Sequence, residues 1–150
     1  MVCLGNICRS PMAEGILLDK IRRRGLSWMV DSAGTESYHV GDAPHPLSVK
    51  VAARHGIDIS GQRARRFTRR DLDRFDRIYA LAPDVYDDIA RIGGRGADLS
   101  RVDLLMNEVE PGRNLAVPDP WYGAEPGYEK AFQLIDTACE CIVEKYQKEA

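Results

Sequence analysis

One stretch of sequence decides the fold, Met1-Val2-Cys3-Leu4-Gly5-Asn6-Ile7-Cys8-Arg9-Ser10-Pro11. Cys3 and Arg9 are separated by five residues, and the Gly5-Asn6 pair between them tolerates a left-handed backbone. Ser10-Pro11 is typical of a helix start, with the serine as N-cap and the proline as the first helical residue. The stretch therefore predicts a tight loop that runs directly into a helix.

Such a loop points several backbone N–H groups at one spot, in front of the positive end of the helix dipole. A cysteine at the start of the loop can attack as a thiolate, and an arginine at its end can hold two phosphate oxygens. We interpret the segment from Cys3 to Arg9 as a phosphate-binding loop with a nucleophile beneath it. The alternative for a bare Cys-x5-Arg pattern is an inert buried cysteine beside a surface arginine. The Gly5-Asn6 pair, Ser10 and the immediate helix start argue against it.

This loop resembles the active-site loop of the low-molecular-weight protein tyrosine phosphatases. Further matching stretches follow in the order of that family: Asp31-Ser32-Ala33-Gly34-Thr35, Arg54-His55-Gly56-Ile57 and Asp119-Pro120-Trp121-Tyr122-Gly123. The resemblance covers nearly the whole chain. It implies a hydrolase that acts on phosphotyrosine in protein or peptide substrates.

The resemblance assigns catalysis to Cys3, Arg9 and Asp119. Cys3 would form a cysteinyl phosphate, Arg9 would bind phosphate oxygens, and Asp119 would act first as general acid and then as general base. No metal or other cofactor is expected, because the loop itself supplies the positive potential. From sequence alone, Asp119 also fits an ordinary turn aspartate before a proline. The residues that complete the phosphate-binding loop are Leu4, Gly5, Asn6, Ile7, Cys8 and Ser10.

The resemblance also implies a supporting hydrogen-bond network of Asn6, Ser10, Ser32 and His55. A side-chain partner would fix the unfavourable backbone conformation of Asn6, and Ser10 can donate its hydroxyl to the Cys3 thiolate. For His55 the alternative is a residue at a helix C-terminus that complements the dipole.

Aromatic side chains match the positions that line the mouth of the cleft in the family; they are Tyr38, Trp121 and Tyr122. Aromatic walls suit a flat phenyl ring and deepen the site, so that a long tyrosine reaches the thiolate better than a serine. Ordinary half-buried aromatics are the alternative, above all for Trp121, where the family more often has tyrosine. A second departure is Ala82, where many relatives carry an aspartate.

The composition is that of one ordinary globular domain over residues 1–150, with 44% apolar and 29% charged residues. The net charge of −2 gives no drive toward nucleic acid, and no stretch approaches the length of a membrane helix. No secretion signal precedes Cys3. Arginines cluster at 63–66 and 69–70, either as a solvated face or as a surface that attracts acidic phosphopeptides. The oligomeric state stays open.

The four cysteines fit neither a disulfide framework nor a zinc site, so a reducing cytoplasm is expected. Cys139 lies on the apolar stripe of the last helix, and Cys141 lies off it. The tight loop could bring Cys3 and Cys8 within disulfide reach, and resemblance to relatives that pair them favours a redox switch. The alternative is that Cys8 packs under the loop as a small hydrophobe.

Strands alternate with helices along the chain, which predicts a three-layer α/β fold with an open parallel sheet of about four strands. Helices would cover both faces, and the phosphate-binding loop would lie at the first strand-to-helix turn. The predicted helices end near Gly25 and Gly56, span 71–74 and 83–93, and include a long last helix with a stripe from Tyr128 to Tyr146. The predicted strands are 27–30, 75–81 and 102–106, with loops at 38–45 and 107–118.

The family normally has a central strand just before the loop, whereas only Met1 and Val2 precede Cys3 here. Loss of that strand would leave its neighbours roughly 10 Å apart, twice the normal spacing. Either residues before Met1 are absent from this sequence, or something else fills the gap.

Three other functions would use a similar phosphate-binding loop. An arsenate reductase on the same scaffold would need relay cysteines, and residues 80–92 contain none. A phosphoarginine phosphatase would resemble this loop but carry threonine in place of Ile7. A non-catalytic phosphate-binding module would need neither the nucleophile Cys3 nor the acid Asp119.

Overall fold

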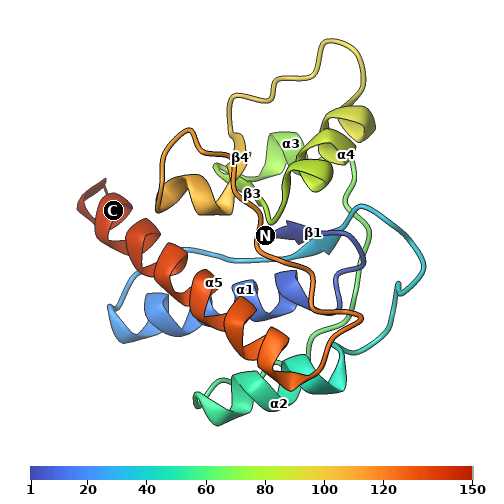
Figure 1. The fold of residues 1–150 in the computed structure, drawn as a ribbon. Helices are drawn as coiled ribbons and strands as arrows, with labels where there is room; N and C mark the ends of the chain where they lie inside the picture. The colour runs from blue at the N-terminus through green and yellow to red at the C-terminus, as the bar shows by residue number, and fades with distance from the viewer. Residues whose placement is uncertain (150) are drawn as a thin grey trace.

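A computed structural model describes residues 1–149 and contains a four-stranded parallel sheet in the order β2-β1-β3-β4. The strands are short: β1 is Val2–Cys3, β2 is Ala33–Gly34, β3 is Ile78–Ala80 and β4 is Val102–Leu104. Helices lie on both sides of the sheet (Figure 1), which confirms the predicted three-layer α/β architecture.

The helices form two groups around the sheet. On one face lie α1 (Arg9–Arg23) and α5 (Glu125–Tyr146), with α2 (Pro46–Arg54) packed against both of them (Figure 1). On the other face lie α3 (Asp71–Arg74) and α4 (Pro83–Gly93), and the short 3-10 helices are η1 (Leu105–Glu108) and η2 (Gln147–Glu149). Each face has its own buried apolar cluster, the larger beneath α1 and α5. The prolines at the starts of α2 and α4 and the apolar stripe of α5 predicted these helices correctly.

The start of α1 differs from the prediction that Ser10 is the N-cap. Arg9 and Ser10 are already helical, and the N-cap residue is Cys8. The physical reason is that the Ser10 hydroxyl is engaged by Asn6 and by the sulfur of Cys3, so it does not cap the helix. Arg9 therefore stands in the first turn of α1, where the helix axis fixes its direction.

The strand predicted at 27–30 is absent, and pairing in this region begins only at Ala33. An apolar run forms a strand only beside a partner, and within residues 1–149 no strand pairs with residues 27–30. A cavity of about 720 Å³ lies there instead, with walls that include residues 27–33 and 75–79. The strand predicted at 102–106 ends at Leu104, and the first residues of the loop predicted at 107–118 belong to η1.

The gap expected in the middle of the sheet is closed at the end that carries the loop. Val2–Cys3 pairs with both neighbours, since the carbonyl of Met1 accepts from the N–H of Ala33 and that of Val2 accepts from the N–H of Leu81. Two strand residues thus suffice to hold the loop that follows between β2 and β3. In the described part of the chain, no helix has the length and apolar character needed to cross a membrane.

Candidate active site

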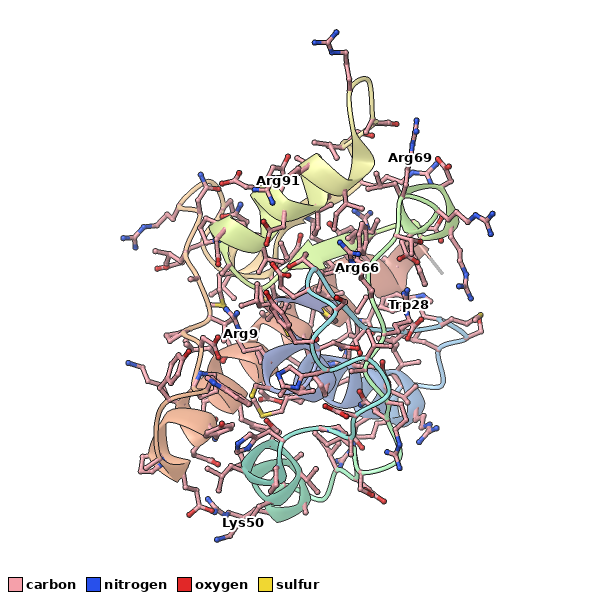
Figure 2. The ribbon with its side chains drawn as sticks, turned by 90° about the vertical axis from the view of Figure 1, so that its right-hand side faces the viewer. Arg9, Trp28, Lys50, Arg66, Arg69 and Arg91 are labelled. Atoms are coloured by element: carbon pink, nitrogen blue, oxygen red, sulfur yellow. The ribbon has the colours of Figure 1, made fainter. Side chains whose placement is uncertain are left out.

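The loop between β1 and α1 lies at the carboxyl ends of the parallel strands. Figure 2 views the molecule from the side toward which β1 points in Figure 1, and Arg9 lies near the middle of this face. Ligands of open α/β sheets bind at this edge. Cys3, Asn6, Cys8, Arg9 and Ser10 are all buried here, and only Leu4 is exposed.

Asn6 holds the loop in its conformation. Its φ of 59° lies in the left-handed region, which a side chain adopts only when neighbouring groups fix it. Its side-chain amide donates to the hydroxyls of Ser10 (2.7 Å) and Ser32 (3.0 Å), and its carbonyl accepts from the backbone N–H of Arg65 (3.0 Å). Three separate chain segments therefore fix the turn that the sequence placed at Gly5-Asn6.

The sulfur of Cys3 lies inside this network. It is 3.0 Å from the Ser10 hydroxyl and 3.3 Å from the backbone nitrogen of Asn6, which donates to it. The predicted contact between Ser10 and Cys3 is thus present.

Ser32 and Arg65 are themselves anchored. The Ser32 hydroxyl donates to Glu14 (2.8 Å), whose pKa is raised chiefly by burial. The Arg65 guanidinium makes two hydrogen bonds to buried Asp71 (3.0 and 3.2 Å) and one to Asp31 (3.1 Å). The pKa of Arg65 is raised: burial alone would lower it, and the two carboxylates outweigh that effect. The partners of Asn6 are therefore rigid.

Gly34 explains the need for glycine in the stretch 31–35. A Cβ on this residue would lie 2.8 Å from the carbonyl oxygen of Leu4, 2.9 Å from the carbonyl carbon of Gly5 and 3.0 Å from the nitrogen of Asn6. Real Cβ atoms essentially never approach a neighbour within 3.0 Å. The phosphate-binding loop packs directly on the backbone of β2 because no side chain stands between them.

Arg9 connects the loop to the segment that carries Asp119. Its guanidinium donates to the carbonyl of Val117 (3.0 Å) and lies 3.6 Å from the Asp119 carboxylate. Val117 in turn donates its N–H to Leu81, at the end of β3. The Asp119 side chain is 41% exposed whereas that of Arg9 is 5% exposed, so the carboxylate stands at the solvent side of a buried guanidinium. The structure thus places Asp119 beside Arg9, and Arg9 stands at the end of the loop that begins at Cys3.

Backbone donors in the loop are available to an anion. Within residues 1–149, the N–H groups of Gly5, Ile7 and Cys8 donate to no protein acceptor. Arginine has five N–H donors, and the hydrogen bond from Arg9 to Val117 uses one of them. Orphan donors at a helix N-terminus beside a buried guanidinium form an anion-binding site.

The predicted aromatic rim is present around Trp121 and absent around Tyr38. The Trp121 ring lies 5.5 Å from that of His39, 5.4 Å from that of His45 and 6.4 Å from that of Tyr122. His39 also covers Gly5, because a Cβ there would lie 3.1 Å from its ring. Tyr38 is 82% exposed, and its ring contacts no aromatic ring in the described chain. Trp121 thus gathers His39, His45 and Tyr122 around it, and His39 brings this group beside the loop.

His55 does not belong to the network predicted for it. Its Nε2 is 2.7 Å from Glu129, and its ring stacks on Phe132 at 4.1 Å, both on α5. The position at the C-cap of α2 directs the ring toward α5 and away from Asn6. The prediction was wrong here, because His55 ends α2 and its side chain packs on α5, the helix next to it.

Cys8 lies below the loop in an apolar setting. Its sulfur is 3.8 Å from the hydroxyl of Tyr128, and burial raises the pKa of its thiol to about 12. The four cysteines are free thiols in this structure, and Cys139 is fully buried in the core as predicted. The pairing of Cys3 with Cys8 stays a prediction.

Sequence reasoning missed Arg65, Glu14 and His39. Arg65 acts on Asn6 through its backbone N–H, which leaves no trace in residue type. Its pairing with Asp31 and Asp71 left no signal in the sequence either, because it requires the tertiary fold. Ala82 is the N-cap residue of α4 without a side-chain cap, so an aspartate at this position would have a helix end to cap.

Comparisons with known proteins agree with this geometry. The sequence model of the family described as "Low molecular weight phosphotyrosine protein phosphatase" matches residues 1–150. The low molecular weight protein-tyrosine-phosphatase YfkJ of Bacillus subtilis (strain 168) is 39% identical over 150 residues, which cover 99% of this chain and 94% of YfkJ. The low molecular weight phosphotyrosine protein phosphatase of Sus scrofa is 32% identical over 146 residues, with coverage of 96% and 92%.

Solved structures show the same fold. The crystal structure of YfkJ superposes with a TM-score of 0.90 and covers 99% of this chain and 92% of that one. The crystal structure of DARP, described as a drosophila arginine phosphatase, also has a TM-score of 0.90, at 27% identity and coverage of 99% and 97%.

Proposed function

The chain belongs to the low molecular weight phosphotyrosine protein phosphatase family, and on that premise we propose that Cys3, Arg9 and Asp119 hydrolyse phosphotyrosine monoesters through a cysteinyl phosphate. One observation carries the proposal. The buried Arg9 guanidinium lies 3.6 Å from Asp119, in the first turn of the helix that follows the loop of Cys3. This pairing of a cation with an acid, at the end of the loop that begins at Cys3, supports the proposal.

In the first step the Cys3 thiolate attacks phosphorus and the bond from phosphorus to the phenolic oxygen breaks. Asp119 gives its proton to the departing oxygen, so tyrosine leaves neutral. Arg9 and the loop N–H groups hold the three remaining phosphate oxygens as charge spreads over them. The Ser10 hydroxyl and the Asn6 N–H stabilise the sulfur anion before attack.

In the second step water attacks the phosphorus of the cysteinyl phosphate. Asp119, now ionised, takes a proton from that water, and the sulfur–phosphorus bond breaks with its electrons returning to sulfur. The products are inorganic phosphate and the Cys3 thiolate. The Ser10 contact serves this step too, because a stabilised thiolate is the better leaving group.

The proposal is tested with a small aryl phosphate in a colorimetric assay. Cys3→Ser should abolish turnover and still bind inorganic phosphate, because the N–H groups and Arg9 remain. Cys141→Ser is the matched control, since Cys141 lies at the far end of α5, outside the site. Full activity in Cys3→Ser would overturn the mechanism, and so would loss of wild-type activity on addition of a chelator.

Phosphoarginine hydrolysis is the second candidate, and the likeness to DARP favours testing it. Ile7 is buried and apolar at the loop position where the phosphoarginine enzymes carry threonine. We expect a higher kcat/KM for a phosphotyrosine peptide than for a phosphoarginine peptide, and we expect Ile7→Thr to reduce the ratio of the two values. A wild-type preference for phosphoarginine would replace the proposed substrate while leaving Cys3 as nucleophile.

The substrates proposed are proteins or peptides that carry phosphotyrosine. A reducing, cytoplasmic setting is proposed as well, because the mechanism needs Cys3 as a free thiolate and all four cysteines are unpaired.

A further inference from the structure

Two exposed arginines, Arg66 and Arg91, line a hollow beside the phosphate-binding loop, and a third exposed arginine, Arg69, follows three residues after Arg66. The hollow has a volume of about 300 Å³ and is lined by Thr35, Glu36, Arg66, Asp88, Arg91 and Ile92. Figure 2 shows Arg66, Arg69 and Arg91 on the same face as Arg9. Arg66 pairs with Gly34 of β2, Arg69 lies in the turn before α3, and Arg91 belongs to α4.

The hollow is joined to the catalytic loop by the backbone. Thr35 donates its N–H to the carbonyl of Cys3 (3.0 Å), and Glu36 donates to that of Leu4 (2.9 Å). The wall of the hollow is thus one strand spacing from the loop, about 5 Å. An extended peptide advances about 3.3–3.6 Å per residue, so residues one to three positions from the phosphotyrosine reach it.

The charges of the hollow divide into paired and unpaired groups. Both carboxylate oxygens of Asp88 already accept a hydrogen bond, one from Thr35 (3.0 Å) and the other from Arg91 (2.8 Å). Within residues 1–149, Arg66 and Arg69 form no ion pair with an acidic side chain. Arg65 next to them differs, because Asp31 and Asp71 neutralise it. Glu36 is the one acid of the lining that forms no ion pair among the described residues, and its negative charge partly offsets the positive charge of Arg66.

We propose that Arg66 and Arg69 form a docking surface for acidic residues that flank the phosphotyrosine in the substrate. The inference rests on the proposed function, because the phosphotyrosine must occupy the loop for its neighbours to meet these arginines. The unpaired guanidinium groups supply the attraction, and Glu36 limits it. The partner is therefore a phosphopeptide with aspartate or glutamate within three residues of the tyrosine.

The test measures kcat/KM for phosphotyrosine peptides that carry aspartate or alanine at each position within three residues of the tyrosine. Wild type should favour acidic peptides, and Arg66→Ala or Arg69→Ala should each lower that preference by about two- to fivefold, the range for exposed charge pairs. Glu36→Gln should raise the preference. Added salt should weaken all three effects, because exposed charges are screened.

A small aryl phosphate separates this proposal from the proposed function. Its turnover should be unchanged in these variants, since the arginines meet only the flanking residues. Arg22→Ala is the matched control, because Arg22 is exposed near the other end of α1, roughly 20 Å from Arg9 at 1.5 Å per residue. Equal kcat/KM for acidic and neutral peptides, or an equal effect of Arg22→Ala, would overturn the docking surface. No turnover of the aryl phosphate by wild type would instead overturn the proposed function.

Discussion

Replacing Gly34 by alanine tests the close packing of the phosphate-binding loop on β2. The added Cβ would lie 2.8 Å from the carbonyl oxygen of Leu4, about 0.6 Å inside the 3.4 Å at which ordinary contact begins. The neighbours are backbone atoms of Leu4, Gly5 and Asn6, so no rotamer change can relieve the overlap. Either the loop or β2 must therefore shift by about half an ångström.

The size of the effect follows from that shift. Overpacking a buried position costs about 1–3 kcal/mol of folding free energy. A misplacement of about 1 Å in a catalytic group can cost 10²-fold in rate, so a shift of half that size should lower kcat by about tenfold or more. Turnover of a small aryl phosphate gives kcat and KM, and urea unfolding gives the stability.

Two other glycines serve as controls for Gly34→Ala. Gly61→Ala makes the same chemical change where no atom lies within 4 Å, and it should leave both activity and stability near wild type. Gly5→Ala meets only side-chain atoms, the His39 ring at 3.1 Å and Ile7 at 3.8 Å, and should cost less than Gly34→Ala. A folded Gly34→Ala enzyme with wild-type kcat would refute the claim that β2 positions the loop.

Three further predictions concern titratable groups. Because a thiolate and a protonated carboxyl must coexist, kcat/KM should be bell-shaped against pH with its optimum below neutral, and Asp119→Ala should slow turnover by about 10²–10⁴-fold. The loss should shrink for good leaving groups, and an equal loss for all of them would show that Asp119 is not the acid. After peroxide and before any reductant, peptide mapping should find Cys3 linked to Cys8, and wild type should then recover activity in dithiothreitol. The link should form faster at higher pH, because burial raises the pKa of the Cys8 thiol to about 12 and the thiolate is the form that attacks the Cys3 sulfenic acid. Full recovery of Cys8→Ser after the same exposure would leave Cys8 a packing residue. Burial raises the pKa of Glu14 from 4.5, so its protonated form stabilises the fold below that pH and this contribution is lost as pH rises through the folded value. Urea unfolding at a series of pH values should therefore show that wild type loses free energy of unfolding relative to Glu14→Gln as the pH rises above 4.5. A constant difference between the two proteins at all pH values would contradict this.

The sequence predicted the parts of the site that depend on local chemistry. Cys3, Asn6 and Ser10 lie within one short loop, so their contacts follow from the turn itself, and the structure contains them. Ser32 joins them from the residue just before β2, as the resemblance implied. Helices with a proline at their start were placed correctly for the same reason, because the signal is local.

Predictions failed where an element depends on a distant partner. The apolar run at 27–30 has the composition of a strand, but no strand within residues 1–149 pairs with it. His55 lies at the end of a helix whether it joins the network of Asn6 or only complements the helix dipole. The packing of α2 on α5 decides that its ring stacks on Phe132. Arg65 was counted with a surface cluster because its pairing with buried Asp71 requires the tertiary fold.

The backbone of Asn6 shows how the fold holds the site ready for phosphate. A residue at φ 59° costs of order 1–3 kcal/mol, and the loop persists only because its surroundings outweigh that cost. The compensating hydrogen bonds involve Ser10 of α1, Ser32 just before β2 and the segment of Arg65, whose guanidinium is fixed by a buried carboxylate. Because these elements also build the two apolar cores, the strain is maintained by the stability of the whole domain. The N–H groups of the loop consequently need no rearrangement when phosphate arrives, which is the condition for strong stabilisation of a transition state.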